Sequence, residues 1–177
     1  MTYWGLTIRT VVVHTVTYFI VGSLAFTIFD YGARFAEAGL STFMRPTSDP
    51  LVMAGPLFQP IRGALFGLVF YLLRNEFFGK PNGWVTMWIV LVMVGIFSTF
   101  GPSPGSVEGF IFTTVPISSQ LFGLIEILAQ SLLLSFVLFY WVEHPEKRWL
   151  TWTLGVAFIL VLVLPALGLL VGQGDIS

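Results

Sequence analysis

The chain has 177 residues, of which 56% are hydrophobic and only 10% are charged. Soluble domains are about 25% charged, so this composition excludes a soluble globular enzyme and a disordered chain. Eight Lys and Arg residues against nine Asp and Glu residues leave no basic field for nucleic acid. The lack of cysteine excludes disulfides and thiolate metal sites. The composition therefore predicts an integral membrane protein.

Five long apolar runs follow one another along the chain. A helix needs roughly 20 residues to cross a hydrocarbon layer of about 30 Å, and the runs are continuous, without the alternation of barrel strands. The first run is longer than a signal-peptide core, so we expect it to be retained as a crossing. We predict one all-α domain, a bundle of five transmembrane helices. The predicted spans are residues 8–29, 57–73, 84–100, 119–141 and 149–171.

The distribution of basic residues predicts the orientation. With the N-terminus inside and the C-terminus outside, five basic residues fall in inner segments, whereas the outer segments hold only Arg34 and Arg45. Most of the tryptophans then lie near the inner interface, as an aromatic belt does. A bacterial-type inner membrane or plasma membrane is the expected location. The inner basic residues are Arg9, Arg74, Lys80, Lys147 and Arg148.

The two predicted outer segments are the longer ones. The segment 30–56 carries Phe35, Leu40, Phe43 and Met44, which we expect to rest on the membrane surface. The segment 101–112 begins with turn residues and ends too apolar to extend into water. We expect this second segment to fold back onto the bundle or dip into it. Residues 53–63 and 98–109 read like family signatures, although no function attaches to either.

Arg62 and Glu126 are ionisable residues within apolar runs, and such residues are by default candidates for a site. Both lie roughly 8–10 Å below the outer edge of the membrane, at 1.5 Å per helical residue. Equal depth and opposite charge favour a structural ion pair that joins the second and fourth spans. One alternative is a binding or proton site that opens to the outside. Another is that Arg62 extends to the interface without meeting Glu126.

Polar and small residues also recur at helical spacing on single faces of three spans. Gln130 and Thr17 lie at similar depths, so contact between the first and fourth spans would create a polar track through Glu126, Gln130, Thr17, His14 and Thr10. Such a track would be either a proton relay or a set of hydrogen bonds that hold helices together. The three stripes are Thr7, Thr10, His14 and Thr17; Gln59, Gly63 and Gly67; and Ser119, Gly123, Glu126 and Gln130.

His14 and His144 are the two histidines of the chain, and both are predicted on the inner side. A two-histidine haem site or a metal site is one interpretation. A hydrogen bond from His14 to a neighbouring helix, with residues 143–148 forming a solvated loop, is the simpler one. We therefore expect no metal, and the sequence does not name a cofactor.

The sequence holds no catalytic set at the spacing of a known enzyme motif, so we regard an enzyme as the less favoured class. The leading hypothesis is a non-catalytic accessory or scaffold subunit of a larger membrane complex or oligomer. Its partners would be the lipid bilayer and other membrane subunits or further copies of the chain. A small transporter, channel or proton-translocating subunit that uses Arg62 and Glu126 is the first alternative. A membrane enzyme or a haem-, quinone- or pigment-binding protein is the second.

Overall fold

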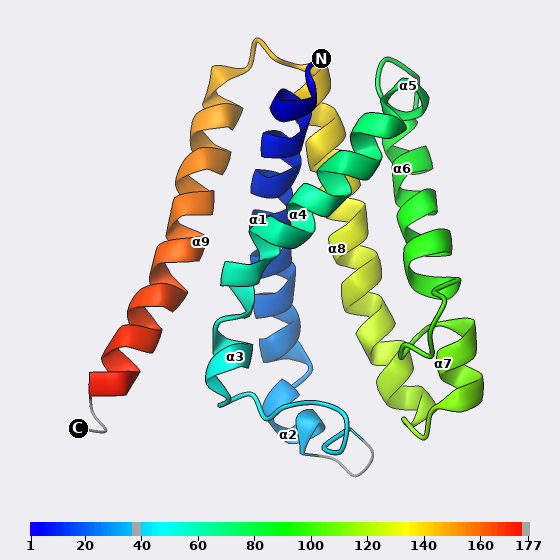
Figure 1. Ribbon diagram of the computed structural model, residues 1–177, viewed down its shortest axis with the longest axis vertical. Helices are drawn as coiled ribbons and strands as arrows, with labels where there is room; N and C mark the ends of the chain where they lie inside the picture. The colour runs from blue at the N-terminus through cyan, green and yellow to red at the C-terminus, as the bar shows by residue number, and fades with distance from the viewer. Residues whose placement is uncertain (37–39, 175–177) are drawn as a thin grey trace.

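The computed structural model describes residues 1–36 and 40–174, and this part of the chain is helical with no strands. Long helices run side by side between two ends, and short helices lie in the connections (Figure 1). The elements are α1 Tyr3–Ile28, α2 Tyr31–Phe35, α3 Pro50–Met53, α4 Gly55–Leu72, α5 Arg74–Phe77, α6 Gly83–Val92, the π-helix η1 Met93–Phe97, α7 Val107–Phe112, α8 Ile117–Glu143 and α9 Arg148–Gly174.

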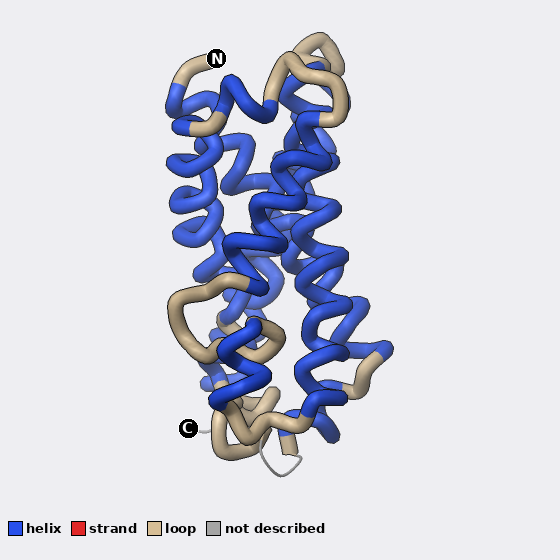
Figure 2. The backbone as a smooth tube through the Cα atoms, turned by 90° about the vertical axis from the view of Figure 1, so that its right-hand side faces the viewer, coloured by secondary structure: helices blue, strands red, loops and turns tan. Residues whose placement is uncertain are grey.

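The two ends of the bundle differ in what they hold. The N-terminus, α5 and the turn from α8 to α9 lie at one end, called here the N-terminal end (Figure 1). The short helices α2, α3 and α7 lie at the opposite end, and a second view shows the same elongated arrangement (Figure 2). Among the described residues, three helices are long and apolar enough to cross a membrane, namely α1, α8 and α9 as far as Leu170. These features fit an integral membrane protein.

The predicted third span is wrong at its end. Its helix, α6, passes into η1 and stops at Phe97, so the continuous apolar helix covers Gly83–Phe97. The chain then turns, with the Thr99 hydroxyl donating to the Gly101 carbonyl, and the Phe100 side chain is fully exposed. A π-helix adds a residue to the hydrogen-bonded ring, which breaks the register of an α-helix. Hydropathy alone did not reveal this break.

α1 lies at the centre of the bundle and contacts α4, α8 and α9. Its predicted polar stripe is buried, because Thr7, Thr10, His14 and Thr17 are all less than 7% exposed. α4 buries Gln59, Gly63, Gly67 and Phe70. The predicted stripes on both helices are therefore confirmed as buried faces.

Gly63 and Gly67 allow α4 to pack closely on α1. A methyl group added at Gly63 would lie 2.7 Å from the Cα of Val11, and one at Gly67 would lie 2.8 Å from the Cα of Thr7. Real side-chain carbons do not approach backbone atoms this closely. Small residues at such positions permit the close helix contacts that stabilise membrane bundles.

The apolar core lies toward the N-terminal end. Phe70 of α4, Phe77 of α5 and Met87 of α6 pack with side chains of α1 and α8, and each is at most 1% exposed. The core continues with Leu6, Val13, Leu134, Leu138 and Trp141. His14 of α1 and Gln59 of α4 lie farther along the bundle, toward the opposite end.

Gln120 of α8 holds the segment 101–115 against the bundle. Its Oε1 accepts a hydrogen bond from the Gly105 backbone N–H at 3.0 Å, and its Nε2 donates to the Val115 carbonyl at 2.9 Å. Gly105 has a φ of 89°, in the left-handed region that glycine adopts without strain. Ser106 then caps α7 through the Gly109 N–H. The expectation that this segment folds back is confirmed.

Candidate functional site

A cavity of about 270 Å³ lies between α2, α4 and α8 and is called here the polar cavity. Arg62 and Glu126, the two ionisable residues singled out by the sequence, both line it together with Gln130. The predicted face of Ser119, Gly123, Glu126 and Gln130 on α8 lines it as a whole. The sequence therefore identified two walls of one cavity.

Apolar residues of the segment 30–56 also line the polar cavity. Phe35, Leu40, Phe43 and Met44 all contribute to the wall, whereas we expected them to rest on the membrane surface. That expectation is corrected in part, since Phe43 and Met44 also remain exposed at 59% and 36%. The helix α2 turns this segment over the end of the bundle. Asp30 at a φ of 47° begins that turn and caps α2 through the Ala33 N–H.

Glu126 takes its hydrogen bond from Tyr31, whose hydroxyl donates to Glu126 Oε2. Within residues 1–36 and 40–174, no ion pair forms between Arg62 and Glu126, so the expected pair is wrong in this structure. The physical reason is that α2 brings a neutral donor to the carboxylate, while the Arg62 guanidinium lies over the Phe66 ring at 5.5 Å. Arg62 and Glu126 therefore line the same cavity, and in the described residues no ion pair bridges it.

The charges around the polar cavity are unequal. Arg34 of α2 joins Arg62 in the wall and stacks over the Phe122 ring at 4.0 Å, with its Nε donating to the Phe29 carbonyl at 2.7 Å. Burial, with the hydrogen bond to Glu126, raises the pKa of Tyr31 above its usual range, so this hydroxyl remains a donor at neutral pH. The wall thus carries two guanidinium groups and one carboxylate that already accepts a hydrogen bond.

His14 of α1 connects α4 and α8 through Gln59 and Gln130, and Gln130 also lines the polar cavity. Its Nε2 lies 3.1 Å from Gln59 Oε1, and the Gln59 amide nitrogen donates to the Gly55 carbonyl at 3.1 Å. The Gln59 oxygen therefore faces the imidazole and accepts from Nε2–H. Gln130 Nε2 approaches the other ring nitrogen, Nδ1, at 3.5 Å. The predicted contact of His14 with neighbouring helices is present, and both ring nitrogens have partners.

The threonines of α1 do not extend the polar track. The Thr17 hydroxyl donates to the Val13 and His14 carbonyls of its own helix, and the Thr10 hydroxyl donates to the Leu6 carbonyl. Threonine hydroxyls within a helix can bond in this way to a carbonyl three or four residues earlier. Among the described residues, the hydroxyls of Thr17 and Thr10 thus make no side-chain hydrogen bond that continues the track beyond His14, and the proton relay stays a prediction.

His144 lies well away from His14. It follows α8, and its Nδ1 donates to the Tyr140 carbonyl at 2.9 Å while its ring stacks on Tyr140. Fourteen residues separate it from Gln130, which is about 21 Å along a helix. The two histidines are not brought together as the ligands of a haem. Among the described residues, no three His, Asp or Glu side chains cluster closely enough to hold a metal ion.

Arg62 and Glu126 also border further cavities. One of about 270 Å³ lies between α4, α6 with η1, and α8, where Arg62, Gln130 and Ser131 meet Gly95 of the π-helix. Another, of about 460 Å³, lies on the α1 side, where Glu126 shares the wall with Tyr18 and Tyr31. Polar side chains therefore line a string of cavities across this half of the bundle.

Sequence reasoning missed Tyr18, Tyr31 and Arg34. Tyr18 lies one helical turn after His14, so the spacing of the α1 stripe could have included it. Tyr31 and Arg34 lie beyond α1, and their positions depend on the turn at Asp30, which no periodicity indicates.

A comparison with protein-family models finds no match, and comparisons with curated proteins and with solved structures find none either.

Proposed function

We propose that the chain is a multi-pass membrane protein with five crossings, its N-terminus inside and its C-terminus outside. The three long apolar helices support this, as do α4 and the α6–η1 helix, which run alongside them between the two ends (Figure 1). The basic residues that belong neither to the polar cavity nor to the segment 30–56 gather at the N-terminal end. An excess of basic residues marks the inside. The polar cavity then belongs to the outer half.

We further propose that the polar cavity binds a small organic anion and that the chain is a small transporter or channel subunit. The observation that carries this proposal is the gathering of Arg34, Arg62, Glu126 and Gln130 around one cavity. Ionisable groups at such depth are costly and mark substrate paths in membrane proteins.

The charge and shape of the cavity favour an anion with an apolar part. Neither Arg34 nor Arg62 has a carboxylate within 4.0 Å among the described residues, so both retain N–H donors for a ligand. Phe35, Phe43 and Phe122 provide the apolar wall. The volume of about 270 Å³ lies just below the usual range for ligand pockets, which suits a small molecule.

Thermal unfolding of the purified protein tests the binding step, with benzoate as the probe and benzamide as its neutral counterpart. A ligand that binds only the folded state raises the unfolding midpoint with its concentration. We expect benzoate to raise the midpoint of the wild type and benzamide to have little effect. Arg62→Gln should abolish the benzoate effect. Arg45→Gln is the matched control, because Arg45 pairs with Asp49 in the same outer segment and does not line the cavity.

The result distinguishes a built site from general salt effects. Equal stabilisation of wild type and Arg62→Gln by benzoate would contradict the proposal, as would equal effects of benzoate and benzamide. Uptake of radiolabelled benzoate into liposomes then tests transport, with Arg62→Gln as the inactive comparison.

The accessory-subunit hypothesis remains the second candidate. Its specific support is α9, whose most apolar 18-residue window is only 11% buried within the chain. Its exposed apolar residues, among them Trp152, Val156, Ile159 and Val163, recur at helical spacing on one broad face, which lipid or another subunit would cover. Extraction from native membranes in mild detergent, followed by measurement of the particle mass, tests this candidate. A particle of a single chain would contradict it.

A further inference from the structure

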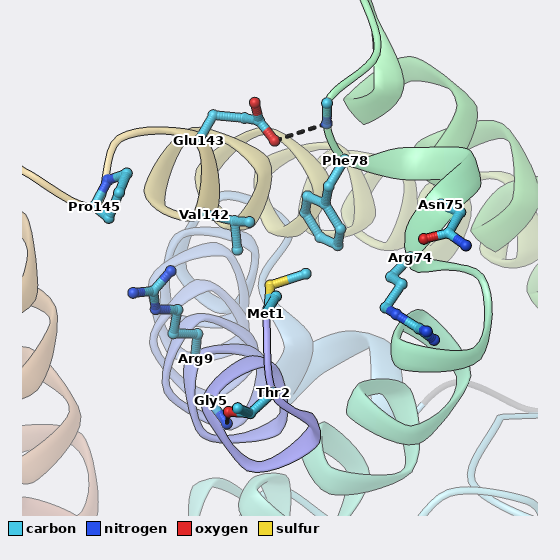
Figure 3. Close-up of a pocket in the computed structure, with 11 residues that line it drawn as sticks. Met1, Thr2, Gly5, Arg9, Arg74, Asn75, Phe78, Val142, Glu143 and Pro145 are labelled. Atoms are coloured by element: carbon cyan, nitrogen blue, oxygen red, sulfur yellow. Dashed lines mark hydrogen bonds between the residues drawn. The ribbon is translucent and has the colours of Figure 1, made fainter.

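A separate cleft, of about 550 Å³, lies at the N-terminal end of the bundle, away from the polar cavity (Figure 3). Its walls come from the first turns of α1, the junction of α4 and α5, and the last turn of α8. Arg9 and Arg74 lie on opposite walls in the close-up, with Met1 between them (Figure 3). The cleft is thus bordered by two cations from two different helices.

Aromatic rings hold both guanidinium groups in place without neutralising them. Arg9 lies over the Trp141 ring at 5.4 Å, and Arg74 lies over the Tyr71 ring at 4.3 Å. Arg74 Nη1 also donates to the Tyr71 carbonyl at 2.8 Å. Neither arginine has a carboxylate within 4.0 Å among the described residues. Both therefore keep N–H groups and full charge for a ligand.

Glu143 is the acidic residue of the cleft. Its Oε1 accepts a hydrogen bond from the Gly79 backbone N–H at 2.9 Å, the contact drawn as a dashed line in Figure 3. This bond directs the carboxylate toward the α5–α6 turn. The side chains that line the cleft therefore carry two guanidinium groups against one carboxylate, and the cleft favours an anion.

The surroundings of the cleft have the character of a membrane interface. Trp4, Trp149 and Trp152 belong to the same end of the bundle and are 70%, 61% and 74% exposed. Exposed tryptophans at one level mark the headgroup region of a bilayer. Ile8 precedes Arg9 and is 60% exposed, and Leu72 precedes Arg74 by two residues and is 69% exposed. Apolar surface thus begins beside each cation.

We propose that this cleft, which Arg9 and Arg74 border, binds the phosphate of an anionic phospholipid headgroup. The acyl chains of that lipid would run along the apolar surface that begins at Ile8 and Leu72. Guanidinium groups bind phosphate through paired N–H donors, and basic pockets between transmembrane helices accept such headgroups. The apolar surface next to the cations selects a lipid over free phosphate. This site is independent of the polar cavity and of its ligand.

Native mass spectrometry of the full chain in mild detergent tests the proposal, with phosphatidylglycerol as the probe and phosphatidylcholine as the zwitterionic comparison. We expect the wild type to retain phosphatidylglycerol in preference to phosphatidylcholine. The double variant Arg9→Gln, Arg74→Gln should retain at least about tenfold less, because two charge-assisted hydrogen-bonding groups are lost. Arg148→Gln is the matched control, since Arg148 is a basic residue of the same end that does not line the cleft.

A second variant keeps the test valid if the double glutamine variant fails to fold. Arg9→Lys, Arg74→Lys retains both charges but loses the paired donors, and we expect it to retain less phosphatidylglycerol than the wild type. Three results would overturn the proposal. They are equal retention by wild type and both double variants, an equal loss in Arg148→Gln, and displacement of the lipid by an equimolar amount of inorganic phosphate.

Discussion

Gln59 orients the imidazole of His14: its Oε1 lies 3.1 Å from His14 Nε2, and its own amide nitrogen is committed to the Gly55 carbonyl. Because the Gln59 amide nitrogen already donates to that carbonyl, the amide oxygen is the atom that faces the ring. The arrangement requires a proton on Nε2 of the neutral histidine. His144 shows the opposite requirement, because its Nδ1 donates to the Tyr140 carbonyl.

The two histidines should therefore be opposite tautomers when both are neutral. ¹⁵N NMR of histidine-labelled protein at about pH 9, well above the ordinary histidine pKa of about 6.5, checks this. We expect one Nε2–H signal set, which disappears in His14→Asn, and one Nδ1–H set, which disappears in His144→Asn. The same tautomer for both residues would contradict the described hydrogen bonds.

The close contact of α1 and α4 predicts a steric effect at Gly63. Gly63→Ala places a methyl group against the Val11 backbone, so we expect the free energy of unfolding to fall by about 1–3 kcal/mol. Gly155→Ala in α9 is the control, because a methyl group there has no atom within 4 Å. The control should be neutral or slightly stabilising, since alanine favours helix. Reversible unfolding in detergent measures both, and equal effects of the two substitutions would count against the packing described.

The hydrogen bonds of Gln120 predict that this residue keeps the segment 101–115 fixed against α8. Gln120→Leu removes the partners of the Gly105 N–H and the Val115 carbonyl in a site where Gln120 is only 3% exposed. Unsatisfied buried polar groups cost about 1–3 kcal/mol each, so the segment should detach from α8. Limited proteolysis should then cleave within 101–115 faster than in the wild type. Unchanged cleavage would show that other contacts hold the segment.

The raised pKa of Tyr31 predicts that the stability of the folded protein depends on pH in the alkaline range. This raised pKa means that the folded protein binds the hydroxyl proton more tightly than the unfolded chain does. The resulting stability is fully present below the ordinary tyrosine pKa of about 10 and is lost as the pH rises through the higher folded value. Tyr31→Phe should remove this dependence. Tyrosinate absorbance during an alkaline titration measures it, and a Tyr31 contribution that titrates near pH 10 would contradict the burial of its hydroxyl.

Periodicity explains what the sequence could predict. The stripes on α1 and α4 repeat at helical spacing, and the same spacing puts Thr7, His14, Gln59 and Gly63 on buried faces that meet. The apolar runs predicted the helices for the same reason, because hydropathy reports burial or lipid contact directly. These are properties of single helices.

Irregular backbone explains what the sequence could not predict. Tyr31 reaches Glu126 because of the left-handed turn at Asp30, and that contact replaces the expected pair with Arg62. η1 ends the third apolar helix early through a change in hydrogen-bond register. Thr17 is on the predicted face, but its hydroxyl turns to its own backbone. Each of these depends on local geometry that residue spacing does not encode.

We infer that the polar cavity is electropositive and is reached from outside. The chain has no cysteine, so a single cysteine can report on it. The measurement is the rate at which Ser119→Cys, in the cavity wall, reacts in sealed vesicles with external methanethiosulfonate reagents carrying a sulfonate or a trimethylammonium group. Ser118→Cys, on an adjacent exposed position outside the wall, is the control.

We expect the sulfonate reagent to react faster than the trimethylammonium reagent at Ser119→Cys, relative to Ser118→Cys. We also expect that adding Arg62→Gln removes this preference, because one of the two guanidinium groups is lost. A preference for the cationic reagent at Ser119→Cys would contradict an electropositive cavity. A preference for the sulfonate reagent that Arg62→Gln leaves unchanged would contradict it as well.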